Sequence, residues 1–235
     1  LLKNKKIVIK EKPFALHVSD IQQYKTIPAF KIFTIVQRQF NPVFINAKND
    51  LSLIGRVYSY RYDYFLKIPF KARGWRASFS SSGGGILADM GYHVVDMLIS
   101  FFGSPTSFNG NFSYCYDDTA KENLEDSVSI LLNHSEKQIQ GVVFLNKHHS
   151  IKKEEFEIIG TEGTLLITQK YYKIFDRNGT LIKEFIPQPI DAKKVMFQEY
   201  LKSVQDEIFI DSHLQHHEDC LYLIEKIYPT IRSKN

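Results

Sequence analysis

The chain has 235 residues, 43% hydrophobic and 14% aromatic, a composition that supports a folded core and excludes a disordered chain. Its 30 lysine and arginine residues exceed its 26 acidic residues by four and are spread along the chain, so nucleic acid is not an expected partner. No apolar run approaches the roughly 20 residues of a membrane span and no signal-peptide pattern opens the chain, so no membrane partner is expected either.

The beginning of the chain shows a strand, a helix and a second strand. An apolar run at residues 6–9 predicts a strand that ends at the Glu-Lys-Pro tripeptide of residues 11–13, because proline lacks the amide donor of a sheet ladder. A short helix is predicted at residues 19–24, capped by Ser19 and ended by Pro28. Residues 31–36 form another apolar strand, which completes a βαβ-like unit.

This unit suggests how the domains are organised. A single βαβ-like unit cannot cover both faces of a parallel sheet, so the rest of its sheet is expected elsewhere. The chain also opens with Leu1 in place of methionine. Residues 1–36 are therefore interpreted as the remnant of a domain from a longer chain, and residues 37–235 as a second domain.

The second domain is predicted to be α+β with a mainly antiparallel sheet. Alternating apolar and polar side chains predict a long strand at residues 54–67, and apolar residues three and four apart predict a helix at 86–102. Glycines and the pair Asn178-Gly179 follow at spacings typical of hairpins. Further helices are expected at residues 43–53, 192–209 and 214–230, and further strands at 107–116, 126–133, 138–147, 154–160, 164–168 and 171–176.

The densest group of polar side chains lies in residues 83–96, which read Gly-Gly-Gly-Ile-Leu-Ala-Asp-Met-Gly-Tyr-His-Val-Val-Asp. Helical spacing places Asp89 and His93 on one face, with Asp96 near the same side. Imidazole has its ordinary pKa near neutral pH, and a neighbouring carboxylate can orient it, which suits the removal of a proton from a hydroxyl. Gly91 would let a ligand approach the helix backbone. The spacing alone also fits a simpler interpretation, in which Asp89 caps the first turn and His93 is a buried histidine satisfied by a neighbour.

No metal site is expected. Asp89 and His93 lack a third ligand at matching spacing. The two cysteines, Cys115 and Cys220, have no C-x-x-C spacing, which argues against a disulfide framework or a cysteine zinc site and favours a reducing, cytoplasmic compartment. The histidines at positions 213, 216 and 217 have partial metal-like spacing but are interpreted, with Glu218, as the polar start of the last helix.

The pattern Gly-Gly-Gly-x-x-x-Asp-x-Gly-x-His-x-x-Asp resembles the signature of the Gfo/Idh/MocA family, and the Glu-Lys-Pro tripeptide is similar to another motif of that family. The segments around Gln37–Pro42, Gly74–Arg76 and Glu125-Asp126 resemble the family in the same order. The resemblance implies the last βαβ-like part of a Rossmann domain followed by a domain with a large open sheet. It also implies an oxidoreductase that transfers a hydride between NAD or NADP and a secondary hydroxyl of a sugar, cyclitol or related polyol.

The same resemblance implies roles for individual residues. Lys12 would lie beside the nicotinamide and the reacting hydroxyl, His93 would be the acid/base, and Asp89 would bind or orient the substrate. The remaining candidates are cofactor contacts at Glu11, Pro13 and Arg38, and substrate contacts at Trp75, Arg76 and Tyr92. Alternatives stay open: Lys12 could be a surface lysine, Arg38 could pair with a carboxylate, and Trp75 could belong to the core.

The chain departs from the family in one respect. No G-x-G-x-x-G motif occurs in it, so the chain by itself is expected to bind NAD(P) poorly and to be inactive. An incomplete oxidoreductase is the favoured interpretation, and a non-catalytic sugar-binding or structural module is the alternative. The sheet face is expected to form a homo-oligomer.

Overall fold

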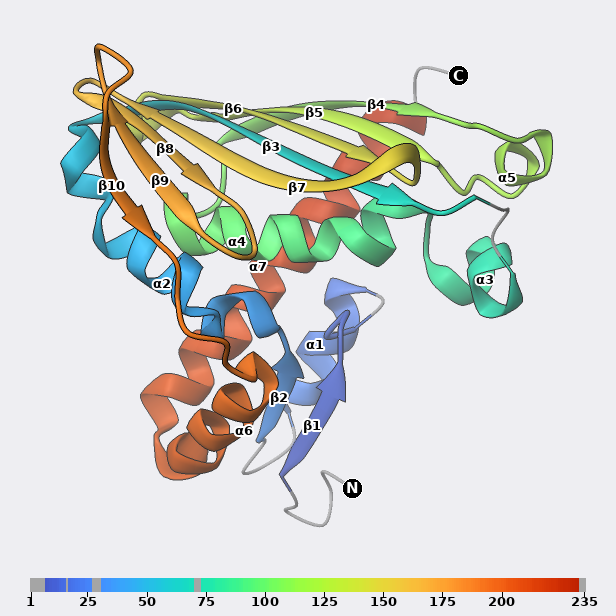
Figure 1. Ribbon diagram of the computed structural model, residues 1–235. Coiled ribbons are helices and arrows are strands. Elements are labelled where there is room, and N and C mark those ends of the chain that lie inside the picture. The colour runs from blue at the N-terminus through green and yellow to red at the C-terminus, as the bar shows by residue number, and fades with distance from the viewer. Residues whose placement is uncertain (1–6, 16, 27–30, 70–72, 233–235) are drawn as a thin grey trace.

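A computed structural model describes residues 7–15, 17–26, 31–69 and 73–232, with side chains as far as Tyr228. Its strands form two separate sheets, one of two strands and one of eight. Figure 1 shows the large sheet with the helices beneath it and the two-stranded sheet lying below them.

The small sheet confirms the predicted βαβ-like unit. Strand β1 (Val8–Glu11) pairs in parallel with β2 (Ile32–Ile35), and helix α1 (Val18–Lys25) connects them. The predicted cap at Ser19 is wrong, because the helix starts at Val18 and its cap is His17, whose backbone N–H donates to the Asp20 carboxylate at 3.1 Å. Pro28 lies outside the described residues.

The large sheet is mixed and mostly antiparallel, as expected for an α+β domain. Its strand order is β10-β9-β8-β7-β3-β6-β5-β4, and only the central pair β3 and β6 runs parallel. Strand β7 starts at His148, ahead of the expected residue 154, and β10 was not predicted as a strand. The strands are β3 (Val57–Lys67), β4 (Ser107–Ser113), β5 (Ser127–His134), β6 (Ile139–Asn146), β7 (His148–Gly160), β8 (Gly163–Ile167), β9 (Tyr172–Asp176) and β10 (Leu181–Phe185).

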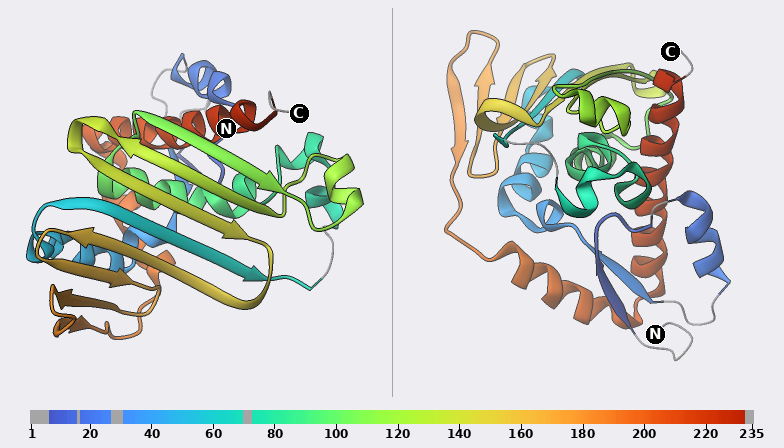
Figure 2. Two further views of the ribbon diagram at one scale, coloured as in Figure 1. Left: turned by 90° about the horizontal axis from the view of Figure 1, so that it is seen from above. Right: turned by 90° about the vertical axis from the view of Figure 1, so that its right-hand side faces the viewer.

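Helices cover one face of the large sheet. Helix α4 (Tyr92–Phe102) lies beneath the strands with α2 (Pro42–Asn49), and the long α7 (Glu207–Arg232) packs against α4. Viewed from above, no described helix crosses in front of the strands, so the other face of the sheet is open (Figure 2). The segment Phe79–Phe102 is long and apolar enough to cross a membrane, but 67% of its apolar window is buried inside the protein, as in a core helix.

The two ends of the chain share a core. Phe33 of β2 stacks on Tyr200 of α6 (Ala192–Lys202), with ring centroids 4.7 Å apart, and Met196 and Ile210 complete the cluster. Strand β2 is thus packed against the last helices, and the proposed boundary after residue 36 stays a prediction.

Several predicted helix ends are wrong for identifiable reasons. Asp206 accepts the backbone N–H of Phe209 at 3.0 Å, so α7 begins at Glu207. The preceding helix, α6, ends at Lys202. The histidines at positions 213, 216 and 217 therefore lie inside α7 and not at its start. The short helices α3 (Phe79–Ser82) and α5 (Asp117–Lys121) were not predicted.

Candidate functional site

The candidate site is built where the three glycines lead into α4. The buried carboxylate of Glu125 accepts hydrogen bonds from the backbone N–H groups of Gly85 and Leu87, both at 2.9 Å, and from the Tyr228 hydroxyl at 2.9 Å. A Cβ on Gly85 would lie 2.1 Å from the Glu125 carbonyl oxygen, so only glycine fits here. Glu125 therefore satisfies the start of this helix, and the interpretation of Asp89 as its cap is wrong.

Between the glycines and α4, residues Leu87–Gly91 form a π-helical turn. Such turns are rare and often occur at functional sites. Gly91 packs tightly here, since a Cβ on it would lie 2.8 Å from the Leu145 side chain. Gly91 therefore faces the sheet, and the expected close approach of a ligand at this glycine is wrong.

Asp89 holds two cations. Its Oδ1 accepts from the Lys12 ammonium at 3.0 Å, its main-chain oxygen accepts a second bond from the same group, and its Oδ2 accepts from Arg76 at 2.7 Å. Burial raises the pKa of Asp89, but the Arg76 hydrogen bond and the Lys12 charge outweigh burial and keep this pKa below its ordinary value. Asp89 is thus an anion that fixes Lys12, a largely buried side chain and not a surface lysine.

His93 lies one turn after Asp89 and is held neutral. Its pKa is lowered to about 2, by burial first and then by the charges of Arg38 and Lys12, while the charge of Asp89 opposes these effects. Its buried Nδ1 has no hydrogen-bond partner among the described residues. His93 is therefore a neutral imidazole with one ring nitrogen unsatisfied, close to Lys12 and Asp89.

Arg38 forms a buried bidentate ion pair with Glu154, with N–O distances of 2.6 and 2.8 Å. Tyr62 donates to the same carboxylate at 2.7 Å. Burial lowers the pKa of Arg38, but the Glu154 hydrogen bond and charge outweigh it, and the pKa is raised overall. Arg38 thus pairs with a carboxylate, as the alternative interpretation stated. Its partner Glu154 was not indicated by the sequence.

A cavity of about 410 Å³ opens beside Asp89, and neither Lys12 nor His93 is among the residues that line it. Arg73, Arg76 and Lys147 line it together with Asp89, so cationic side chains outnumber carboxylates on its wall. Trp75 does not line this cavity: it is 52% exposed, and its ring stacks against the Arg76 guanidinium at 4.1 Å. The interpretation of Trp75 as a core residue is therefore wrong.

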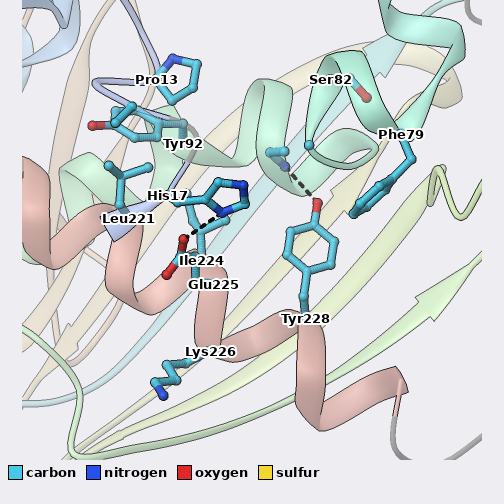
Figure 3. A pocket seen from close by; sticks show the side chains of 13 residues that line it. Pro13, His17, Phe79, Ser82, Tyr92, Leu221, Ile224, Glu225, Lys226 and Tyr228 are labelled. Carbon is cyan, nitrogen blue, oxygen red and sulfur yellow. Dashed lines mark hydrogen bonds and ion pairs between the residues drawn. The ribbon is translucent and has the colours of Figure 1, made fainter. Parts of the chain in front are cut away.

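A second cavity, also about 410 Å³, meets the same helix at Ala88 and Tyr92 (Figure 3). Tyr92 is fully buried, and its hydroxyl pairs with His217 Nδ1 at 2.8 Å. Pro13 also lines this cavity, whereas Glu11 is exposed at the end of β1. The predicted substrate contact of Tyr92 thus has no support from the first cavity and stays a prediction.

Asp96 belongs to a different group of side chains. It is fully buried and accepts hydrogen bonds from His216 at 2.7 Å and from Gln39. The expectation that Asp96 joins Asp89 and His93 is therefore wrong, because the π-helical turn and α4 direct it towards α7.

Comparison with known proteins identifies the domain. The family model of the GFO/IDH/MocA C-terminal domain matches residues 50–166. Levoglucosan dehydrogenase in complex with NADH and levoglucosan is 17% identical with a TM-score of 0.83, over 100% of this chain and 74% of that chain. A putative myo-inositol dehydrogenase from Sinorhizobium meliloti 1021 is 17% identical with a TM-score of 0.78, over 100% of this chain and 74% of that chain.

An oxidoreductase from Agrobacterium radiobacter, solved with NAD+, L-tartaric acid and magnesium, is 17% identical with a TM-score of 0.76, over 100% of this chain and 73% of that chain. No curated protein matches the chain. At these identities the solved structures establish a shared fold, and they confirm the expected fold class.

Proposed function

The chain belongs to the Gfo/Idh/MocA family, and on this premise we propose that it carries the catalytic residues of an oxidoreductase. The reaction is hydride transfer between NAD(P) and a secondary hydroxyl of a sugar, cyclitol or related polyol. One observation carries the proposal: His93 is a neutral imidazole with an unpartnered Nδ1 among the described residues, beside a fixed ammonium group. The imidazole is unprotonated and so free to accept a hydroxyl proton, but its pKa of about 2 makes it a weak base before substrate binds, and substrate binding has to raise this pKa for the transfer to occur.

In this proposal each residue has a separate task. His93 accepts the hydroxyl proton of the substrate, and the Lys12 ammonium stabilises the negative charge that develops on that oxygen. Asp89 holds Lys12 in place, and Arg76 holds Asp89 from the other side. Bound NAD(P) supplies the acceptor for the hydride that leaves the substrate carbon.

The residues present fit one end of that cofactor. Lys12 and His93 suit the reacting nicotinamide end, and the orphaned Nδ1 of His93 is the observation that supports this fit. The 235 residues contain no G-x-G-x-x-G motif, so they offer no glycine-rich loop for the pyrophosphate. The cofactor contacts predicted for Glu11, Pro13 and Arg38 stay predictions, and Arg38 is already committed to Glu154.

The cavity next to Asp89 suggests what the substrate carries. Arg73, Arg76 and Lys147 on its wall favour a polyol with a negatively charged group, such as a sugar acid, over a neutral one. Two of the neighbours named above were solved with a small molecule, one with levoglucosan and the other with L-tartaric acid.

Self-association through the sheet is part of the proposal. Leu131 of β5 and Val142 of β6 are cross-strand neighbours and both are exposed. They suit the expected homo-oligomer contact.

Turnover by the chain tests the function. NAD+, NADP+ and the shorter nicotinamide mononucleotide, which depends less on a pyrophosphate loop, are each supplied at high concentration with a panel of neutral polyols and sugar acids. Reduced nicotinamide is followed by absorbance, and sugar binding by calorimetry. The high concentrations offset the weak cofactor binding, and under them we expect slow turnover that falls by about 10²–10⁴-fold in His93→Gln and Lys12→Met, while His17→Gln, which removes an exposed imidazole, keeps it.

Two other results would speak against this function. Sugar binding without turnover with any of the three nicotinamides would favour the non-catalytic sugar-binding module. Turnover that persists in His93→Gln would remove His93 from the role of base.

A further inference from the structure

A second cluster of polar side chains lies between α4 and α7, away from the Asp89 cavity. Asp96 comes from α4, and His216, His217 and Cys220 come from one turn of α7. One ligand atom of each residue lies within 4.8 Å of the ligand atoms of the other three. Asp96, His217 and Cys220 are fully buried, and His216 is largely buried.

Two of these buried atoms have no partner. Asp96 Oδ2 and His217 Nε2 make no hydrogen bond to any part of the chain that the structure describes. A buried polar atom without a hydrogen-bond partner destabilises the folded state. Two such atoms in one cluster indicate that the cluster is completed by something else, and a cation would satisfy both.

The donor set indicates which cation. One carboxylate oxygen, two imidazole nitrogens and one thiolate sulfur suit Zn²⁺, whereas Mg²⁺ and Ca²⁺ prefer oxygen ligands alone. The charges also balance, because an ionised Asp96 and an ionised Cys220 neutralise a divalent cation in a buried position. We propose that Asp96, His216, His217 and Cys220 form a zinc site that joins α4 to α7.

The surrounding side chains resemble the outer partners of a metal site. The Nδ1 atom of His217 pairs with the Tyr92 hydroxyl at 2.8 Å, which leaves Nε2 for the metal. Gln39 donates a hydrogen bond to Asp96 Oδ1. Such contacts fix the orientation of ligands and are a usual feature of metal sites.

One observed separation matches zinc coordination, and the others require small movements. Tetrahedral zinc places its nitrogen and sulfur ligands about 3.6 Å apart and its nitrogen and oxygen ligands about 3.4 Å apart. Cys220 Sγ lies 3.7 Å from His216 Nε2, and Asp96 Oδ1 lies 2.7 Å from the same nitrogen in a direct hydrogen bond. Binding therefore replaces that hydrogen bond and draws the more distant ligand atoms closer, which small side-chain rotations can achieve.

The site would act on the catalytic helix by position. Asp96 follows His93 by three residues on α4, so a metal that ties Asp96 to α7 holds the turn that carries His93. These residues are positioning residues, because none of them contacts the Asp89 cavity among the described residues. The histidines of α7 were not expected to be metal ligands because their own spacing was incomplete. That spacing does not include Asp96, which lies far from them in the sequence.

Cobalt binding provides the sharpest test. The untagged chain is stripped with a chelator and titrated with Co²⁺, which shows a thiolate-to-metal absorption band only when a cysteine coordinates it, and then with Zn²⁺ in competition. The matched control is Cys115→Ser, which removes the exposed cysteine and leaves Cys220 alone in the chain. The second variant is Cys220→Ser.

We expect one equivalent of metal, with the thiolate band, in the wild type and in Cys115→Ser, and its displacement by Zn²⁺. Cys220→Ser is expected to lose the band and at least about 10-fold in affinity. The absence of a thiolate band from the wild type, or its loss in Cys115→Ser, overturns the site. Because Cys115→Ser decides the assignment alone, the test stands even if Cys220→Ser does not fold.

Discussion

Replacing His93 by glutamine removes a buried imidazole that stays neutral while the unfolded chain protonates. The pKa of His93 is lowered from 6.5 to about 2 by burial first and then by the charges of Arg38 and Lys12. Between these values the unfolded state binds a proton that the folded state does not bind. Because the pKa of His93 is lower in the folded state than in the unfolded state, this histidine lowers the free energy of unfolding of the wild type as the pH falls below about 6.5.

The magnitude follows from the same difference. Each pH unit in this window changes the free energy of unfolding by about 1.4 kcal/mol per proton. Between about pH 7.5 and about pH 4.5 the wild type should therefore lose about 3 kcal/mol relative to His93→Gln. The result is insensitive to the folded pKa as long as it lies more than a unit below the window.

Urea unfolding at a series of pH values measures this effect. The measured quantity is the difference in free energy of unfolding between the wild type and His93→Gln, followed as a function of pH. Because only the change of this difference with pH is used, a constant cost of burying glutamine cancels. His17→Gln, which removes an exposed imidazole, is the matched control. A difference that does not change with pH would refute a neutral, buried His93 and, with it, the proposed base.

Two further substitutions test the surroundings of the site. Glu154→Gln leaves Arg38 buried without its bidentate carboxylate and should cost about 3–5 kcal/mol in urea unfolding, whereas Glu162→Gln breaks an exposed ion pair and should cost at most about 1 kcal/mol; equal costs would contradict a buried ion pair. Gly85→Ala places a Cβ 2.1 Å from backbone and should cost about 3 kcal/mol or more, whereas Gly91→Ala meets only leucine side chains and should cost less; the reverse order of thermal stabilities would contradict the role of Glu125.

The periodic parts of the fold could be predicted from the sequence. Alternation in β3 and the spacing of apolar residues in α4 reflect burial on one face, and burial is what such patterns report. β10 was missed because its residues are exposed or only half buried, so no apolar pattern marks it. The early start of β7 was missed because residues 148–153 are largely polar.

The candidate site was predicted in part. Asp89, Lys12 and His93 lie close together, as expected. They could be predicted because each lies on a motif that can be recognised in the sequence. Glu154 and the role of Glu125 could not be inferred, because each acts on a partner 38 or more residues away and only the folded sheet brings them together. Asp96 was misplaced because regular α-helical spacing was assumed where the chain forms a π-helical turn.

Helix α7 has a mechanical consequence. It has 26 residues and spans about 39 Å. Along its length, the Nε2 atom of His213 accepts the backbone N–H of Thr34 on β2, and the hydroxyl of Tyr228 donates to Glu125 and accepts the N–H of Ala88. The helix thus contacts strand β2 near one end and the π-helical turn of Leu87–Gly91 near the other. A rotation of the small sheet against the large one would therefore displace α7 against this turn, which leads directly into His93.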